Sequence, residues 1–370
     1  LAEGSHYPMP VPDVNSAEYL IVTRLTLAAT AGQMTMLGAE ELVARVAPAG
    51  SQLVGEKRMR SLWAGYGSVS QLVLEVAPAA RGGWPPERLA LIIKRVEAPN
   101  DEGVGHERKL RSYLNEGCFY RELAPQLLAE GISVPEPLLV EADGPGQLTL
   151  VMRDQRDEFP SSAGALSLAQ AKAALSWLAA FHAHFWGQPP PAGLWEQGTF
   201  WHLDTRREEF TQMDWRALAD AAEQIDAYLK GEAGDSVRDH MTVVHGDFKE
   251  ANLLFSADGS RCAAHDFQYC GGGLGAKDIA YLFCSGLGSG LLPAREGELL
   301  AHYHGELTAR LGPRGLGEGY TPAVMARHLD YALADFVRFM DGWGYWGNNA
   351  WAEAKVAAFL ETLGRGCEEA

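Results

Sequence analysis

The chain has 370 residues, enough for two lobes with a core each, and its 47% hydrophobic and 21% charged residues are typical of a soluble globular protein. Its formal net charge of −17 argues against a nucleic-acid or anionic-membrane partner, because both would repel it. Membrane insertion is not expected, since no apolar run reaches the ~18 residues that a membrane helix requires.

The five cysteines are scattered, and no Cys-x-x-Cys pattern occurs. A disulfide framework or a zinc site is therefore not expected, and a reducing compartment, the cytoplasm, is predicted. Residues 1–15 are polar and rich in proline, without the apolar region of a signal peptide. Because the chain starts at leucine, removal of a transit peptide ahead of it stays open.

The first 152 residues are predicted to form a small, sheet-rich N-lobe. Helices are expected from residue 16 and over 38–46, strands over 52–62, 69–76 and 88–96, a long helix over about 106–130, and two further strands near 138–140 and 148–152. The strands would form a mostly antiparallel sheet.

Beyond residue 152 the pattern becomes helical and predicts a larger C-lobe, residues 153–370. Apolar residues recur at helical spacing from Ser167 to Trp186, and a second helix is expected over 215–229. A strand over 241–244, a hairpin with arms at 253–256 and 261–265, and helices from 276 to the end complete the prediction. The expected fold class is α+β, with a small antiparallel-sheet N-lobe beside a mostly helical C-lobe.

The most informative stretch is residues 245–252 (HGDFKEAN), which is followed by residues 265–268 (HDFQ). Asp247 and Asn252 are five residues apart, and Asp266 follows Asn252 by fourteen. This is the layout of a kinase catalytic loop followed by a metal-binding Asp-Phe turn. Phosphoryl transfer needs one carboxylate to accept a hydroxyl proton, and oxygen ligands that hold Mg²⁺ against nucleotide phosphates. The pattern therefore predicts Asp247 as the base and Asn252 and Asp266 as metal ligands.

A lysine for the nucleotide phosphates is predicted at Lys94, which ends the apolar run 89–93. A lysine there either points into the cleft between the lobes or keeps its ammonium in solvent. The following helix favours the cleft, because it supplies a glutamate partner. Glu107 and Glu116 are nine residues apart, about 180° around a helix, so they cannot both face inward. Glu116 shares its face with large apolar residues and is preferred.

A glycine-containing turn, Gly65-Tyr66-Gly67-Ser68, lies between the first two predicted strands. In a kinase, backbone N–H groups approach the phosphates at this point of the chain. Ordinary hairpin turns use the same Gly-x-Gly pattern, and both interpretations stay open.

Three residues near the motif are expected to support it. Lys249 either offsets charge on the γ-phosphate or is a solvated loop lysine. His245 is expected to brace the loop by hydrogen bonding, and Asp278 to anchor the loop from the start of the next helix.

Two aromatic-rich stretches, residues 195–202 and 343–351, are candidate walls of an acceptor pocket. Trp201, Trp343 and Trp346 are the residues chosen. Aromatic walls enclose a cationic head group or an apolar ring system. Ordinary helix packing is the alternative interpretation.

With these residues identified, the chain resembles the aminoglycoside phosphotransferase/choline kinase superfamily, and within it the ecdysteroid-kinase-like (CHK-kinase-like) branch. The resemblance runs from about residue 65 to residue 283. It rests on LIIK (91–94), EGCFYREL (116–123), AAFHA followed by FW (179–186), HGD through Asn252, DFQ (266–268) and DIAY (278–281).

The resemblance implies a protein-kinase-like two-lobed fold and ATP- and Mg²⁺-dependent phosphate transfer to a hydroxyl of a small molecule. It places Asp247 as base, Asn252 and Asp266 on Mg²⁺, and Lys94 with Glu116 on the phosphates. Glutamine after Asp-Phe favours the ecdysteroid-kinase-like branch over choline kinases, which usually carry an acidic residue there. Residues 248–249 and 265 depart from the insect members, so the insect-steroid substrate is not carried over.

Other functions are kept beside this one. They are a choline/ethanolamine or aminoglycoside kinase proper, and a nucleotide-binding pseudokinase scaffold. The intact Lys94, Asp247, Asn252 and Asp266 argue against the scaffold. The expected partners are ATP and a small hydroxylated substrate, such as a sterol-like, amino-alcohol or amino-sugar compound. The sequence predicts no oligomeric state.

Overall fold

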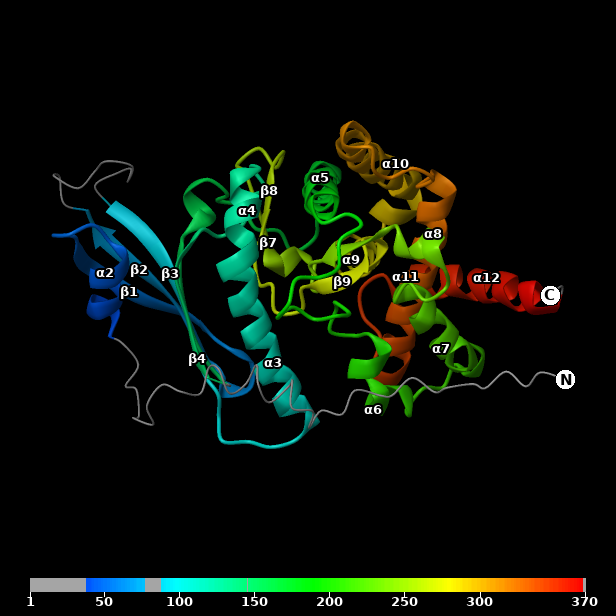
Figure 1. The fold of residues 1–370 in the computed structure, drawn as a ribbon, viewed down its shortest axis with the longest axis horizontal. Coiled ribbons are helices and arrows are strands. Elements are labelled where there is room, and N and C mark those ends of the chain that lie inside the picture. Colours follow the sequence, from blue (N-terminus) through cyan, green and yellow to red (C-terminus); the bar gives the residue numbers. More distant parts are fainter. Residues whose placement is uncertain (1–37, 77–87, 145, 369–370) are drawn as a thin grey trace, which may run out of the picture.

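The computed structural model of the chain describes residues 38–76, 88–144 and 146–368. These residues form two lobes, a sheet-rich N-lobe and a helical C-lobe (Figure 1). The predicted α+β class is confirmed. The helix predicted from residue 16 lies outside the described residues.

The N-lobe contains a five-stranded antiparallel sheet with the strand order β1-β2-β3-β5-β4. Its strands are β1 (Gln52–Ser61), β2 (Gly67–Glu75), β3 (Arg88–Glu97), β4 (Pro137–Gly144) and β5 (Gln147–Arg153). All five were predicted, and the observed ends differ from the predicted ones by a few residues.

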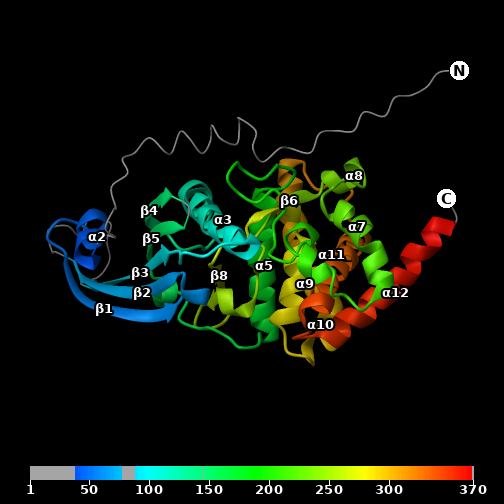
Figure 2. The ribbon, with the colours of Figure 1, turned by 90° about the horizontal axis from the view of Figure 1, so that it is seen from below.

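The two faces of this sheet bury different partners. On β3, Leu89, Leu91 and Ile93 pack with α2 (Ala39–Val46) at the outer face of the sheet. Side chains alternate along a strand, so Ile92, Lys94 and Val96 point to the opposite face, toward the rest of the molecule. Figure 2 shows α2 at the far end of the N-lobe. This alternation brings a lysine into the interlobe cleft.

The predicted long helix is confirmed as one helical segment with an internal irregularity. It consists of α3 (Val104–Cys118), a π-helical turn (Phe119–Leu123) and α4 (Ala124–Ala129). The segment stands between the sheet and the C-lobe (Figure 1). Phe119, Tyr120 and Leu123 of the π-helical turn are buried, so the extra turn residue adds to the apolar contact between the lobes.

The C-lobe is built around α5 (Leu168–His184) and α11 (Pro322–Trp343). Ser167 caps the start of α5 in a capping box. The backbone N–H of Gln170 donates to the Ser167 hydroxyl, and the backbone N–H of Ser167 donates to the side-chain oxygen of Gln170. α10 packs on α5, while α7, α9 and α12 pack on α11. The remaining helices are α6 (Arg207–Phe210), α7 (Arg216–Leu229), α8 (Asp235–Arg238), α9 (Ala276–Ser285), α10 (Leu291–Leu311) and α12 (Asn349–Glu368).

Four short strands carry the motif region. The predicted hairpin is present as β7 (Leu253–Phe255) and β8 (Cys262–Ala264). β6 (Met241–Val244) pairs with β9 (Gly271–Leu274), a strand that the sequence did not predict. Its first three residues are glycines, which carry no strand pattern. Glycine is needed there, because a Cβ on Gly271 would come within 2.3 Å of the carbonyl oxygen of Trp195.

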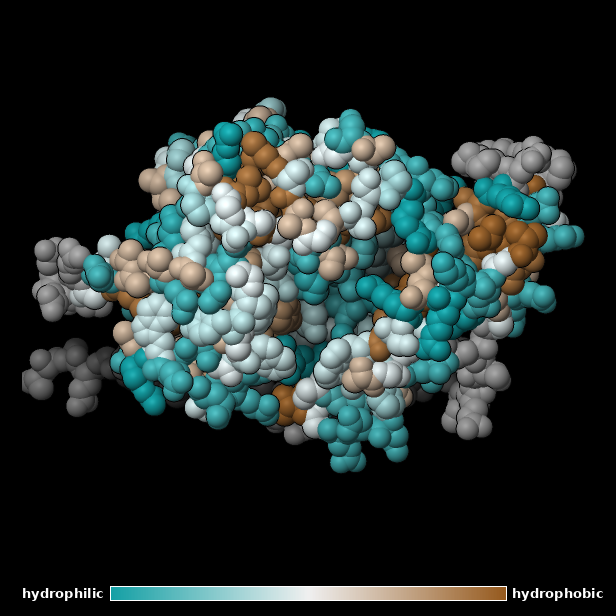
Figure 3. Space-filling view, turned by 180° about the vertical axis from the view of Figure 1, so that it is seen from behind, coloured by the Kyte–Doolittle hydropathy of each residue, from teal (hydrophilic) through white to brown (hydrophobic). Residues whose placement is uncertain are grey.

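Hydrophobic residues lie in separate patches among hydrophilic ones on the face shown in Figure 3. Among the helices described, none combines the length and the apolar character that crossing a bilayer requires. Cys118, Cys262, Cys270 and Cys284 are free thiols.

Candidate active site

Lys94 on β3 and Glu116 on α3 form a buried ion pair at the interlobe cleft. The lysine Nζ lies 2.8 Å from Oε1 and 2.7 Å from Oε2 of the glutamate, and the two side chains are only 4% and 2% exposed. Glu107, the other glutamate considered, is exposed. Burial by itself lowers the pKa of Lys94, but the carboxylates of Asp266 and Glu116 outweigh burial and raise that pKa. The lysine is therefore charged at neutral pH.

Asp266 lies on the turn after β8, with its Oδ1 3.3 Å from Nζ of Lys94. Its φ of 71° is unusual for a residue with a side chain and costs roughly 1–2 kcal/mol. The next residue holds the turn in place, because the Phe267 ring is fully buried and stacks on Phe119 at 3.6 Å between ring centres. The apolar side chain thus fixes the carboxylate that precedes it.

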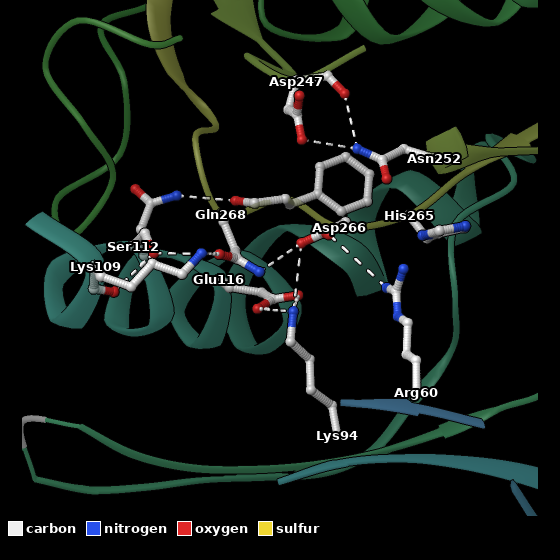
Figure 4. Close-up of polar contacts among 12 residues, drawn as sticks. Arg60, Lys94, Lys109, Ser112, Glu116, Asp247, Asn252, His265, Asp266 and Gln268 are labelled. Atoms are coloured by element: carbon white, nitrogen blue, oxygen red, sulfur yellow. Dashed lines mark hydrogen bonds and ion pairs between the residues drawn. The ribbon is translucent and has the colours of Figure 1, made fainter. Parts of the chain in front are cut away.

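Gln268 ties this turn to α3. Its Nε2 donates to Oδ1 of Asp266 at 2.7 Å, and its Oε1 accepts from Nζ of Lys109 at 2.6 Å and from Oγ of Ser112 at 3.2 Å (Figure 4). Lys109 and Ser112 were not predicted, although a signal was present. They precede Glu116 by seven and four residues and so share its helix face.

The Asp266 carboxylate is surrounded by positive charge. Burial works to raise its pKa, but Lys94, Lys109 and Arg60 contribute to holding that pKa below its usual range. Arg60 lies near the end of β1, with its Nη2 4.0 Å from Oδ2 of Asp266. Arg60 was also missed, and the mostly exposed β1 carries no pattern that would have identified it.

Asp247 is the second carboxylate of the site. Both of its oxygens accept from Nζ of Lys249 at 3.0 Å, and Oδ2 also accepts from Nδ2 of Asn252 at 3.0 Å. Burial raises the pKa of Asp247 to about 6, with Asp266 adding to the shift and Lys249 and Asn252 opposing it. A carboxylate with this pKa is ionised at neutral pH and remains basic enough to accept a proton.

His245 and Asp278 hold the loop that carries Asp247. The two oxygens of Asp278 accept from the backbone N–H groups of His245 at 2.7 Å and Gly246 at 2.9 Å. The His245 ring accepts at Nδ1 from the Asp247 N–H and contacts the carbonyl oxygen of His265 through Nε2. Burial lowers the pKa of His245, so the neutral ring with its proton on Nε2 fits both contacts.

Two further contacts stiffen this support. His182 of α5 lies with Nε2 3.1 Å from Asp278 and Nδ1 2.8 Å from the Tyr303 hydroxyl. Gly246 has a φ of 81°, and a Cβ there would lie 2.0 Å from the carbonyl oxygen of Tyr269. Only glycine allows the loop that carries Asp247 and the Asp-Phe turn to approach this closely.

The interlobe cleft is open beside these residues. Its walls combine apolar and charged side chains of both lobes: Met59, Arg60, Val69, Ile92, Lys94, Glu116, Tyr120, Pro135, Met152, Arg153, Asp154, Gln155, Arg156, Ala251, Leu254, His265 and Asp266. The residues lining this cleft do not include Gly65, Gly67 or Ser68. Tyr66 of that turn is buried and hydrogen-bonds to His106 at 2.6 Å.

The oxygen donors of Asn252 and Asp266 fit Mg²⁺. Asn252 uses its Nδ2 on the backbone and side chain of Asp247, which leaves its amide oxygen available, and Asp266 offers a carboxylate. Within the described residues, no three His, Cys, Asp or Glu side chains gather as a closed metal cage. Mg²⁺ is usually bound through one or two protein oxygens plus substrate phosphates.

The three predicted pocket tryptophans differ in environment. Trp201 is fully buried and packs against Tyr281 and Phe336, so its side chain belongs to the C-lobe core. Trp346 is partly buried on Phe336, whereas Trp343 is 61% exposed. Of the three, Trp343 is the most accessible to a ligand.

Comparison with known proteins gives a family and several distant structural relatives. The profile of the family described as "Phosphotransferase enzyme family" (APH) matches residues 41–315. No protein of curated function matches the sequence significantly.

Three solved structures illustrate the relatives. A microcompartment-associated aminopropanol kinase has 16% identity and a TM-score of 0.47, over 92% of this chain and 95% of its own. A choline kinase, LicA, from Streptococcus pneumoniae has 14% identity and a TM-score of 0.47, over 86% of this chain and 97% of its own. A thermostable mutant of aminoglycoside phosphotransferase APH(4)-Ia was solved in a ternary complex with ADP and hygromycin B. It has 15% identity and a TM-score of 0.46, over 88% of this chain and 98% of its own. At these distances, the family match and the geometry of the site carry the functional argument.

Proposed function

The chain belongs to the phosphotransferase enzyme family, and from this premise we propose that it is an ATP-dependent kinase that phosphorylates a hydroxyl of a small molecule. The observation that carries the proposal is the grouping of three sets of polar side chains beside one cleft. Lys94, Glu116 and Asp266 line the cleft, and Asp247 with Asn252 lies close enough to Asp266 for that carboxylate to raise the pKa of Asp247 (Figure 4).

Each group has a role in the proposal. Lys94, fixed by Glu116, binds the α- and β-phosphates, while Asn252 and Asp266 hold Mg²⁺, which offsets the phosphate charge when bound. Asp247 accepts the proton of the acceptor hydroxyl as its oxygen bonds to the γ-phosphorus. The bond from that phosphorus to the β-phosphate oxygen breaks, which leaves ADP and a phosphate ester, and the proton passes from Asp247 to solvent. Lys249 offsets charge on the transferred group.

The two lobes divide the work in this proposal. Residues 1–152 bind the nucleotide, and residues 153–370 supply the catalytic loop and the acceptor site. Within the family we assign the chain to the ecdysteroid-kinase-like branch. The contacts of Gln268 with Asp266, Lys109 and Ser112 support that assignment, because they give the glutamine after Asp-Phe a physical role.

The first test is nucleotide binding followed by thermal unfolding. MgATP at 100 times its Kd should stabilise the protein by about 2.7 kcal/mol. The Asp266→Ala variant should lose most of this effect. Asp235→Ala, which removes an 88%-exposed carboxylate on α8, should keep it. A wild-type protein that MgATP does not stabilise would contradict the kinase proposal.

The second test is phosphate transfer to a panel of hydroxylated metabolites, including choline, ethanolamine and aminoglycosides. Asp247→Asn should lower kcat by about 10²–10⁴-fold with MgATP binding retained, while Asp235→Asn should have no effect. A protein that binds MgATP and phosphorylates no acceptor would instead be a pseudokinase scaffold.

A further inference from the structure

Positive side chains gather near Tyr269, a neighbour of Asp247, although the chain as a whole carries a charge of −17. Arg108 and Lys109 come from α3, and Arg206 comes from the segment just before α6. The two segments are joined where Nη1 of Arg108 donates to the carbonyl oxygen of Thr205. A negatively charged protein thus places three cations at one point.

Arg206 is held rigidly. Its side chain is 11% exposed, and its guanidinium lies 5.6 Å from the ring centre of Phe200, 5.2 Å from that of Phe339 and 5.4 Å from that of Trp343. Its Nε donates to the carbonyl oxygen of Phe200 at 2.8 Å. Aromatic faces and a hydrogen bond fix the guanidinium in advance, as an oxyanion site requires.

The half-buried rings of Phe200 and Tyr269 form an aromatic surface that links Arg206 to Asp247. The Phe200 ring lies 5.6 Å from both the Tyr269 and the Tyr281 rings. Burial raises the pKa of Tyr281 and the nearby charge of Asp247 raises that pKa further, and Tyr269 lies close enough to Asp247, Arg206 and Arg108 for their charges to influence its pKa. A small molecule on this surface would have one end at Asp247 and the other at the arginines.

The positive charge is only partly compensated. Nη1 of Arg206 pairs with Glu209 at 2.9 Å. For Arg108 and Lys109, no carboxylate lies within ion-pair distance among the residues with described positions. Burial lowers the pKa of Arg206, and the charge of Arg108 lowers it further, as expected for two guanidiniums held near each other. Like charges in this arrangement favour binding of an anion.

We propose that the acceptor carries an oxyanion, a carboxylate or a phosphate, in addition to the hydroxyl that is phosphorylated, and that Arg206 and Arg108 bind it. This inference rests on the proposed function and narrows its substrate class. A guanidinium donates two parallel hydrogen bonds to either oxyanion, and the aromatic surface suits the carbon skeleton in between. A cationic amino alcohol or amino sugar would meet positive charge at this end of the site.

The first experiment needs no knowledge of the acceptor and uses sulfate as the probe. Thermal unfolding is followed with saturating MgAMP-PNP, in sodium sulfate and in sodium chloride of equal ionic strength. The excess stabilisation by sulfate should fall to half or less in Arg206→Met and Arg108→Met, which keep the apolar stem. Arg207→Met is the matched control, because Arg207 is an exposed neighbour that pairs with Asp204.

Equal sulfate effects in all four proteins would overturn the inference. Acetate and inorganic phosphate, tested in the same way, distinguish a carboxylate site from a phosphate site. If MgAMP-PNP itself gives no stabilisation, the proposed kinase function fails, and this outcome is separate from failure of the anion site.

The second experiment compares matched acceptors at fixed MgATP: glycolate with ethanolamine, glucuronate with glucosamine, and glycerol 3-phosphate with glycerol. The anionic member of a pair should have a kcat/KM about tenfold higher or more. Arg206→Met should raise the KM for that acceptor by a similar factor and change the KM for ATP less than about twofold. Preference for the cationic or neutral members would overturn the inference and leave the kinase function intact.

Discussion

Asp247 is the residue at which the demands of the fold and of the proposed chemistry oppose each other. Burial makes its carboxylate costly to ionise, while Lys249 and Asn252 stabilise the charge. The balance is a pKa of about 6. A base is most useful when its pKa is close to the working pH and its carboxylate is still ionised there. Burial of Asp247 therefore raises its pKa into the range that suits a base.

This balance predicts the pH dependence of the reaction. The kcat/KM for ATP should fall as the pH drops through about 6, because protonated Asp247 cannot accept the hydroxyl proton. Lys249 lowers the pKa of Asp247, so Lys249→Met should move the acid limb of the profile to higher pH by about one unit. Lys172→Met, at a surface lysine paired with Glu298, should leave the limb in place. A limb that stays unmoved in Lys249→Met would show that the lysine does not set this pKa.

At the scale of single elements, the two glycines of the turn between β1 and β2 differ in their surroundings, although no pattern in the sequence distinguished them. Gly65 and Gly67 both have positive φ, 80° and 134°. A Cβ on Gly67 would lie 2.0 Å from the carbonyl oxygen of Arg95 on β3, whereas nothing lies within 4 Å of a Cβ on Gly65. Gly67 therefore serves the close approach of strands, and Gly65 is the one with open space around it.

Alanine substitutions at these positions should differ in their cost. Gly67→Ala forces two backbones apart and should lower the free energy of unfolding by about 3 kcal/mol, while Gly65→Ala adds only backbone strain of about 1 kcal/mol. Urea unfolding of the two variants measures both values. Equal losses would mean that the contact with Arg95 is not what requires glycine at position 67.

The elements themselves were predictable where one residue pattern decided the outcome. The apolar run along β3 predicted the strand, the glutamate of the following helix favoured the inward direction of Lys94, and the 3.6-residue period of α3 selected Glu116 over Glu107. β9 had no such pattern, because its glycines allow the backbone of another segment to approach closely. Its existence depends on the packing of residue 195, which is 76 positions upstream of Gly271.

At the scale of the whole molecule, the site divides into a part that sequence spacing reveals and a part that it does not. Asp247, Asn252 and Asp266 lie within 20 residues of one another, so a local motif indicates them. Arg60 and Arg206 reach the site from β1 and from the segment before α6, and neither position has a local signature. The proposed chemistry could be predicted from the motif, whereas the positive charge of the proposed acceptor site arises only when distant segments fold together.

The lobes also share one apolar core, and this has a consequence for unfolding. Val96 and Leu150 of the sheet, Phe119 of the π-helical turn, and Trp177 and Phe267 of the C-lobe belong to a single buried cluster. Lobes joined only by a linker unfold separately, but a large apolar interface couples their unfolding.

We therefore expect calorimetry to show one cooperative transition, which MgATP shifts as a whole. Phe267→Ala tests the coupling, because it removes a fully buried ring that stacks on Phe119 and should cost about 3–5 kcal/mol. If the shared core unites the lobes, this variant should unfold at lower temperature, with the transition broadened or split as the lobes separate. Phe359→Ala, at a C-terminal helix position remote from the lobe contact, should lower the transition temperature without splitting it. Two separate transitions in the wild-type protein, of which MgATP shifts only one, would mean that the lobes unfold independently despite their common core.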